Sequence, residues 1–249
     1  MKNYTISKTN MEDHIEKIGI DVRPIIELKM EKEHLYSFYN QLIEKYPNLF
    51  ESLVQSPNNF QVKKKFIFPG KGELELTTLA VTQRGLVLII PRKVVIFDEQ
   101  TNVDETEKIV IEFLKIFRKN FPHKKICRVG QINEYIFTLG QNRSVQFLAE
   151  RFTRIRMPSN GELRIRVNRP VDDYNRVIEM QPVQKMEQAK EIPGEQHVVA
   201  YGLKVVVDFN NRDMSKDLDT DRIRGIIQSS IQFNNKELYE FLNMAEENK

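Results

Sequence analysis

Several features that would assign the sequence to a familiar class are missing. The 249 residues include one cysteine, Cys127, so no disulfide can form within the chain and no multi-cysteine zinc site exists. A single cysteine suits a reducing compartment. The formal net charge is only +3, which excludes a chain-wide attraction to polyanions. Any such attraction must come from a local basic surface.

Long apolar runs are also absent. The first residues, MKNYTISKTNMEDHIEKIG, contain no hydrophobic stretch of the kind found in secretory signals. The longest strongly apolar runs, such as GLVLII at 85–90, are far too short to span a bilayer. We therefore expect a cytoplasmic protein that does not enter a membrane.

The common catalytic motifs do not occur either. We find no G-x-S-x-G, no H-E-x-x-H and no dinucleotide-binding fingerprint, and a hairpin turn explains the two glycines of FPGKGELE at 68–75. The four histidines are not spaced as metal ligands. A buried, unreactive thiol is the expectation for Cys127. We accordingly predict no catalytic residue, no metal site and no cofactor, and favour a protein that is not an enzyme.

Apolar residues recur with clear periods along most of the chain. Steps of three and four residues predict helices at 31–53, 102–121, 144–152 and 219–249. Pro47 is expected to end or kink the first of these helices, and Asn234-Asn235 is a candidate break in the last. Alternation predicts strands at 23–30, 59–68, 124–139, 153–157, 163–168, 174–181 and 197–209, with two or three more between 73 and 99.

This order of elements predicts an α+β protein. Short turns between the middle strands favour antiparallel, meander-type sheets, with long amphipathic helices packed on one face. We divide the chain into a flexible N-terminal arm at 1–19, a β-α-β-β-β-α-β half at 20–140, and a β-rich half with C-terminal helices at 141–249. Whether the two halves form one continuous domain stays open.

Arginines recur with a period of two in RFTRIRMPSNGELRIRVNR at 151–169. We interpret this stretch as a β-hairpin. A three-residue loop ending at Gly161 pairs Met157 with Leu163 and Ile155 with Ile165, so that the apolar residues share one face. The other face then carries four arginines, with Arg156 opposite Arg164 and Arg154 opposite Arg166.

Four guanidinium groups on one ribbon repel one another and require neutralisation. Carboxylates of the same chain could supply it, with candidates Glu150, Glu162, Asp172, Asp173 and Glu179. A phosphate-rich or acidic ligand is the alternative, because the arginine fork suits phosphates and carboxylates. The clusters Lys63-Lys64-Lys65 and His123-Lys124-Lys125 could extend the basic surface. Phe152 is the one aromatic residue in the ribbon, whereas single-strand binders use aromatic platforms.

Five aspartates gather in DFNNRDMSKDLDTD at 208–221. The spacing at 217–221 hints at a calcium loop, but the sixth and twelfth positions hold Arg222 and Gln228 instead of Gly and Glu. We favour the capping of a helix N-terminus by Asp219 or Thr220. Metal-dependent hydrolysis by the acids from Asp208 to Asp221 remains an alternative.

Several segments carry a family resemblance: PIIELKM before a helix ending KYPNLF, ICRVGQIN after a helix ending NFPHKK, and VVVDFNN before the last helices. In these the chain resembles a sporadically distributed, uncharacterised bacterial family. That family has an Arg-Tyr-x-Asn run after Arg128-Val129-Gly130, where this chain has Gln131-Ile132-Asn133. The resemblance implies a cytoplasmic α+β protein of bacterial type and no particular activity. It also implies structural roles for Arg128, Gly130 and Asn133, with Gly130 allowing close approach and Asn133 hydrogen bonding within the sheet.

Taken together, these patterns predict a non-enzymatic binding or assembly protein. Its partner would be a protein with an acidic surface, or a second copy of the chain. The predicted binding residues are Arg154, Arg156, Arg164 and Arg166. The alternatives are binding of nucleic acid or nucleotide phosphate by the same arginines, and the metal-dependent hydrolase above.

Overall fold

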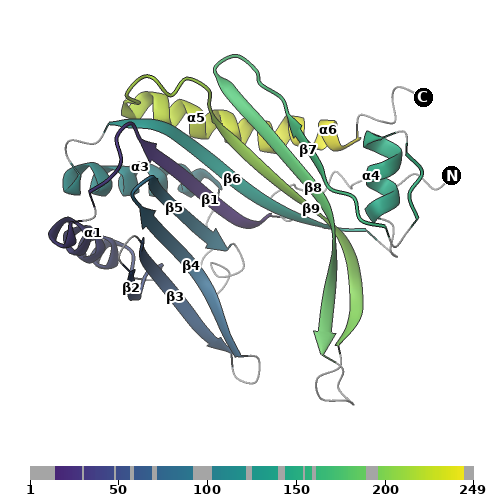
Figure 1. The fold of residues 1–249 in the computed structure, drawn as a ribbon, viewed down its shortest axis with the longest axis horizontal. Coiled ribbons are helices and arrows are strands. Elements are labelled where there is room, and N and C mark those ends of the chain that lie inside the picture. Colours follow the sequence, from purple (N-terminus) through teal and green to yellow (C-terminus); the bar gives the residue numbers. More distant parts are fainter. Residues whose placement is uncertain are drawn as a thin grey trace.

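Nine strands form a single antiparallel sheet in the part of the chain that the computed structural model describes (Figure 1). The described residues are 15–29, 31–47, 49–56, 59–68, 72–91, 103–121, 125–139, 144–153, 155–158, 161–188 and 196–243. The strand order across the sheet is β2-β3-β4-β5-β1-β6-β9-β8-β7. The prediction of an α+β fold built on an antiparallel sheet is confirmed.

The strands span Ile15–Pro24 (β1), Ser52–Ser56 (β2), Asn59–Phe68 (β3), Gly72–Thr82 (β4), Gly85–Pro91 (β5), Ile126–Thr138 (β6), Ile165–Asn168 (β7), Tyr174–Gln188 (β8) and Gln196–Asn211 (β9). The helices span Lys32–Lys45 (α1), Val103–Asn120 (α3), Ser144–Phe152 (α4), Thr220–Gln232 (α5) and Leu238–Asn243 (α6). A π-helical turn, Phe233–Glu237, joins α5 to α6, so the chain stays helical through Asn234-Asn235.

Strands β2 to β5 form the predicted meander, but β1 is inserted between β5 and β6. It pairs with β5 through Ile20–Leu88 and with β6 through Ile20–Gln131. On the other side of β6, β9 continues the sheet. The two halves distinguished in the sequence therefore contribute to one sheet.

All described helices lie on the same side of this sheet, as predicted. Phe38 of α1 packs edge-on against Phe113 and Phe117 of α3, with ring centroids 5.7 and 6.1 Å apart. The π-helical turn places Phe233 6.0 Å from Phe209 of β9. The α4 helix joins this layer because Phe152 contacts Phe241 of α6 at 5.4 Å.

The core lies between the sheet and these helices. Alternate residues of the described strands point into it, as the alternation in the sequence requires, and most of those in the central strands are almost fully buried. Burial of each such large side chain stabilises the fold by about 1.5–3 kcal/mol. Examples from five strands are Phe60, Ile20, Val129, Val207 and Ile178.

The first strand begins earlier than predicted. Residues 15–19, assigned to a flexible arm, lie in β1, whereas 25–29 of the predicted strand at 23–30 are not in a strand. Ile18, Ile20 and Val22 alternate with Gly19, Asp21 and Arg23, so a buried face exists although charged residues interrupt it. The remainder of the predicted arm, 1–14, lies outside the described residues.

The predicted arginine hairpin is wrong. Residues 155–158 form no strand, and β7 pairs with β8 instead, aligning Ile165 with Met180 and Arg166 with Glu179. This pairing buries Ile165 and Val167 toward the helices beside Met180 and Ile178. The segment at 155–158 contains Pro158, which has no backbone N–H to donate, so it offers β7 a poorer pairing partner than β8 does.

A proline explains where β7 stops. Arg169 donates its backbone N–H to the carbonyl of Arg176 at 2.9 Å, so the even-numbered residues of β8 form the hydrogen bonds to β7. The next such residue beyond Met180 is Pro182, which has no N–H to donate. Pairing ends there, and the chain at 161–164 leaves the edge of β8.

Among the described residues no helix is long and apolar enough to cross a membrane.

Two glycines give a matched test of this backbone. Gly85 ends the β4–β5 turn with φ of +146°, and an added Cβ would lie 2.2 Å from the Val22 carbonyl oxygen of β1. We expect Gly85→Ala to lower the free energy of unfolding by about 1–3 kcal/mol. Gly225 of α5 has no atom within 4 Å of such a Cβ, so Gly225→Ala should raise it by about 0.5–1 kcal/mol. Urea unfolding of both variants measures this, and equal effects would contradict the β1–β5 contact.

Candidate binding surface

The face of the sheet opposite the helices, here called the open face, carries the charged residues. Registers and ion pairs assign its members, because directly paired residues share a face. Among the described side chains, seven are basic and four are acidic. The basic ones are Lys17, Arg23, Lys63, Arg128, Arg164, Arg166 and Lys204, and the acidic ones are Asp21, Glu134, Glu179 and Asp208.

Three of these residues form a buried charge cluster, here called the Arg128 cluster. The Arg128 guanidinium on β6 contacts the carboxylate of Asp21 on β1 and lies 3.1 Å from Asp208 Oδ2 on β9. The side chains of Arg128 and Asp21 are only 9% and 10% exposed. The single guanidinium lies between two carboxylates, so the three residues together carry a charge of −1, and it ties three strands together.

A glycine makes room for the cluster. A Cβ on Gly130 would lie 3.2 Å from Asp208 Oδ1 and 3.1 Å from the Cβ of Asn210. The Asn210 amide also donates to Asp208 Oδ1 at 2.9 Å. The structural roles predicted for Arg128 and Gly130 are therefore confirmed. Asn133, on the buried face, donates to the Tyr135 hydroxyl at 3.2 Å, as expected of a hydrogen bond within the sheet.

The other acids of the open face are also matched by bases. Glu134 lies 2.7 Å from Lys204 Nζ and 3.8 Å from Lys17 Nζ. Glu179 forms an ion pair with Arg164. Because the four acids are all engaged and the bases outnumber them, the open face keeps a positive excess.

Two of the four predicted binding arginines, Arg164 and Arg166, lie on the open face. Arg164 pairs with Glu179, one of the candidate neutralising carboxylates, and Arg166 lies opposite the same residue. Arg156 is exposed on a segment without strand structure, and Arg154 lies outside the described residues. Within the described part of the chain, Arg156 and Arg166 make no ion pair or hydrogen bond through their side chains.

The lysine cluster at 63–65 does not extend this group. Lys63 lies on the open face of β3, at the far end of the sheet from β7. His123 and Lys124 lie outside the described residues, as does the side chain of Lys65.

The aspartates at 208–221 are dispersed rather than convergent. Asp219 caps α5 by accepting the Arg222 N–H at 2.8 Å, as predicted. Asp217 accepts the Ile126 N–H at 2.9 Å, and Asp221 pairs with Arg224 at 3.1 Å. Hydrogen bonds from Ser215 hold the pKa of Asp213 below its ordinary value. No group of three His, Cys, Asp or Glu side chains suited to a metal occurs among the described residues.

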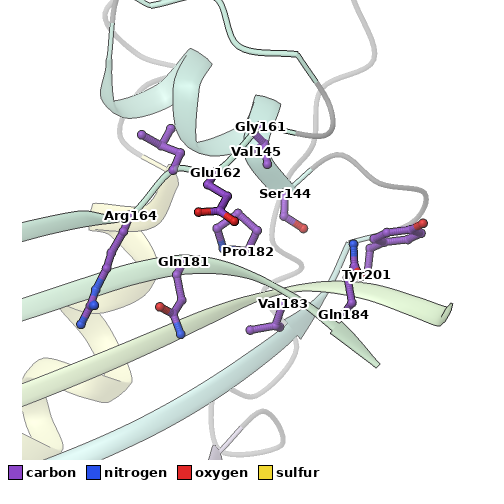
Figure 2. Close-up of a pocket in the computed structure, with 11 residues that line it drawn as sticks. Ser144, Val145, Gly161, Glu162, Arg164, Gln181, Pro182, Val183, Gln184 and Tyr201 are labelled. Atoms are coloured by element: carbon purple, nitrogen blue, oxygen red, sulfur yellow. The ribbon is translucent and has the colours of Figure 1, made fainter. Parts of the chain in front are cut away.

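A cavity of about 850 Å³ opens where β7 stops (Figure 2). The diverging chain at 161–164 forms one wall, β8 at 181–184 forms another, and the first turn of α4 and Tyr201 of β9 complete it. Sequence reasoning identified only Arg164 and Glu162 of its lining. The rest carries no short motif, because the cavity depends on Pro182 ending the β7–β8 pairing.

No family model and no curated protein matches this chain. The resemblance to the bacterial family therefore stays a prediction that rests on the motifs themselves.

The Arg128 cluster predicts a large and specific loss of stability. Arg128→Met removes the buried cation that two carboxylates share, so we expect the free energy of unfolding to fall by about 3–5 kcal/mol. Arg23→Met is the control, because Arg23 contacts the same Asp21 at 3.3 Å but its side chain is half exposed. An exposed ion pair of this kind contributes about 0–1 kcal/mol to stability, so this variant should lose no more than that. Asp21→Asn with Asp208→Asn should restore part of the loss in Arg128→Met. Equal losses in the two arginine variants would contradict the cluster.

The thiol of Cys127 should be unreactive. Burial raises its pKa, and its sulfur donates to the Arg23 carbonyl at 3.4 Å. The folded protein should therefore react with iodoacetamide at pH 8 far more slowly than the urea-unfolded protein, as followed by mass spectrometry. Equal rates would show that this strand is open to solvent.

Proposed function

We propose that this protein is a non-enzymatic binding protein whose open face engages the acidic surface of a partner protein. The observation that carries the proposal is the excess of basic side chains on this face, over which no described helix packs. The surface differs from the predicted hairpin but keeps the predicted partner chemistry.

The distribution of charge supports a specific interface. The Arg128 cluster pairs one guanidinium with two carboxylates and provides a largely buried centre. Arg23 and Arg166 flank it with exposed guanidinium groups, and Lys17 is half exposed. Exposed cations around a fixed centre attract an acidic surface and orient it.

Apolar groups on the same face favour a protein over a nucleic acid. Ile89 and Val54 are 37% and 53% exposed, and Ile132, Val177 and Val206 are partly exposed beside the charges. No aromatic side chain lies on the described part of the open face, whereas single-stranded nucleic acids bind on aromatic platforms. A mixture of aliphatic and basic groups suits an acidic protein surface.

Fluorescence anisotropy with labelled poly-glutamate tests the proposal. We expect binding at low salt that weakens between about 50 and 200 mM salt, because exposed charges are screened. The variant Arg23→Gln with Arg166→Glu should bind about tenfold more weakly, corresponding to about 1.4 kcal/mol.

A matched control makes the same change in charge on the helical side. Arg222→Glu with Lys236→Gln lowers the net charge by three, as the test variant does, at exposed sites on α5 and the π-helical turn. It should bind poly-glutamate more tightly than the test variant. Absence of poly-glutamate binding, or equal loss in both variants, would overturn the proposal. Preferential binding of a DNA duplex would replace it with nucleic-acid binding.

A further inference from the structure

The cavity beside α4 has the elements of an anion site. Its lining includes Ser144 and Val145, the first two residues of a nine-residue helix. The first backbone N–H groups of a helix have no partner within it and carry the positive end of the helix dipole. They bind phosphate groups in many proteins.

A second, independent observation points to a ligand at this place. The Ser144 side chain is 3% exposed, and its hydroxyl has no hydrogen-bond partner among the described residues. In Figure 2 the Ser144 hydroxyl points from the first turn of α4 toward β8 and β9, across the cavity. A buried hydroxyl without a partner is costly, and an acceptor bound in the cavity would satisfy it.

The remaining lining indicates the rest of the ligand. Figure 2 shows Arg164 at the end of the cavity opposite Ser144 and Tyr201, with Glu162 between them. Arg164 uses part of its guanidinium on Glu179 and retains further N–H donors. Glu162 is exposed at the cavity and can accept hydrogen bonds from donating groups, such as the hydroxyls of a sugar.

We propose that this cavity binds a small, hydroxyl-bearing organic phosphate, with its phosphate at the N-terminus of α4 beside Ser144. The ligand is of the size of a sugar phosphate or a nucleoside monophosphate, since about 850 Å³ exceeds the volume of inorganic phosphate several times. Its hydroxyls face Glu162, and Arg164 supplies a cation at the far end. Tyr201 and Pro182 provide apolar contacts. The site is independent of the binding of an acidic protein.

Calorimetry and thermal unfolding with four probes test the proposal: ribose 5-phosphate, AMP, adenosine and inorganic phosphate. We expect saturable binding of ribose 5-phosphate or AMP with a rise in Tm, and much weaker binding of adenosine and inorganic phosphate. Stronger binding of AMP would identify a nucleotide, and equal binding of the two esters would identify a sugar phosphate.

Variants locate the site. Ser144→Asp places a negative charge where the phosphate binds while remaining favourable for the helix dipole, so it should abolish binding. Arg164→Gln should weaken binding about tenfold, corresponding to about 1.4 kcal/mol. Arg166→Gln, two residues along the same chain and outside the cavity, should bind like the unmodified protein.

Three results would overturn the proposal: no binding of either ester, equal binding of adenosine and AMP, or unchanged binding in Ser144→Asp. If Ser144→Asp does not fold, the comparison of Arg164→Gln with Arg166→Gln decides, and equal affinities in that pair would also overturn it.

Discussion

Arg128 joins three strands that are distant in the sequence. Its guanidinium contacts Asp21 of β1 and Asp208 of β9, so one side chain bridges residues separated by 187 positions. Removing Arg128 leaves two carboxylates without their shared cation in a largely buried setting, where an unpaired ion is far more costly than in water. Gly130 is part of the same constraint, because any larger residue would displace the Asp208 carboxylate. The centre of the sheet and of its open face depend on this arrangement.

The two proposed surfaces differ in construction. On the open face, matched ion pairs leave a surplus of exposed cations spread over several strands, which suits a broad and weakly specific contact with another macromolecule. The cavity beside α4 is a concave cleft partly open to solvent, has polar groups of both kinds and contains a hydroxyl that lacks a partner among the described residues. A concave shape and convergent polar groups are typical of small-molecule sites. Arg164 borders both surfaces, as do Gln181 and Val183 of β8.

The sequence predicts element types well and their neighbours poorly. The sequence alternates with a period of two at 161–169, and the structure shows the same alternation in the exposure of these side chains. This alternation does not indicate, however, that the strand pairs with β8 and not with residues 153–157. A buried face identifies a strand, whereas pairing depends on long-range geometry. The same applies to the candidate sites. Arg128, Gly130 and Asp208 stand out as short motifs, but their contact follows only from the pairing of β6 with β9. Ser144 and Tyr201 carry no signal at all.

The place of β1 also bears on how the chain acquires its structure during synthesis. This strand leaves the ribosome well before its two neighbours: Leu88 of β5, opposite Ile20, comes 68 residues afterwards, and Gln131 of β6 comes 111 residues afterwards. Until then both edges of β1 lack their partners. Pairings of such long range are formed slowly, because loop closure must precede the gain from contacts. The nascent chain must therefore keep a strand with Ile18, Ile20 and Val22 in solution until β5 and β6 have been translated, a period in which chaperones would have a ready substrate.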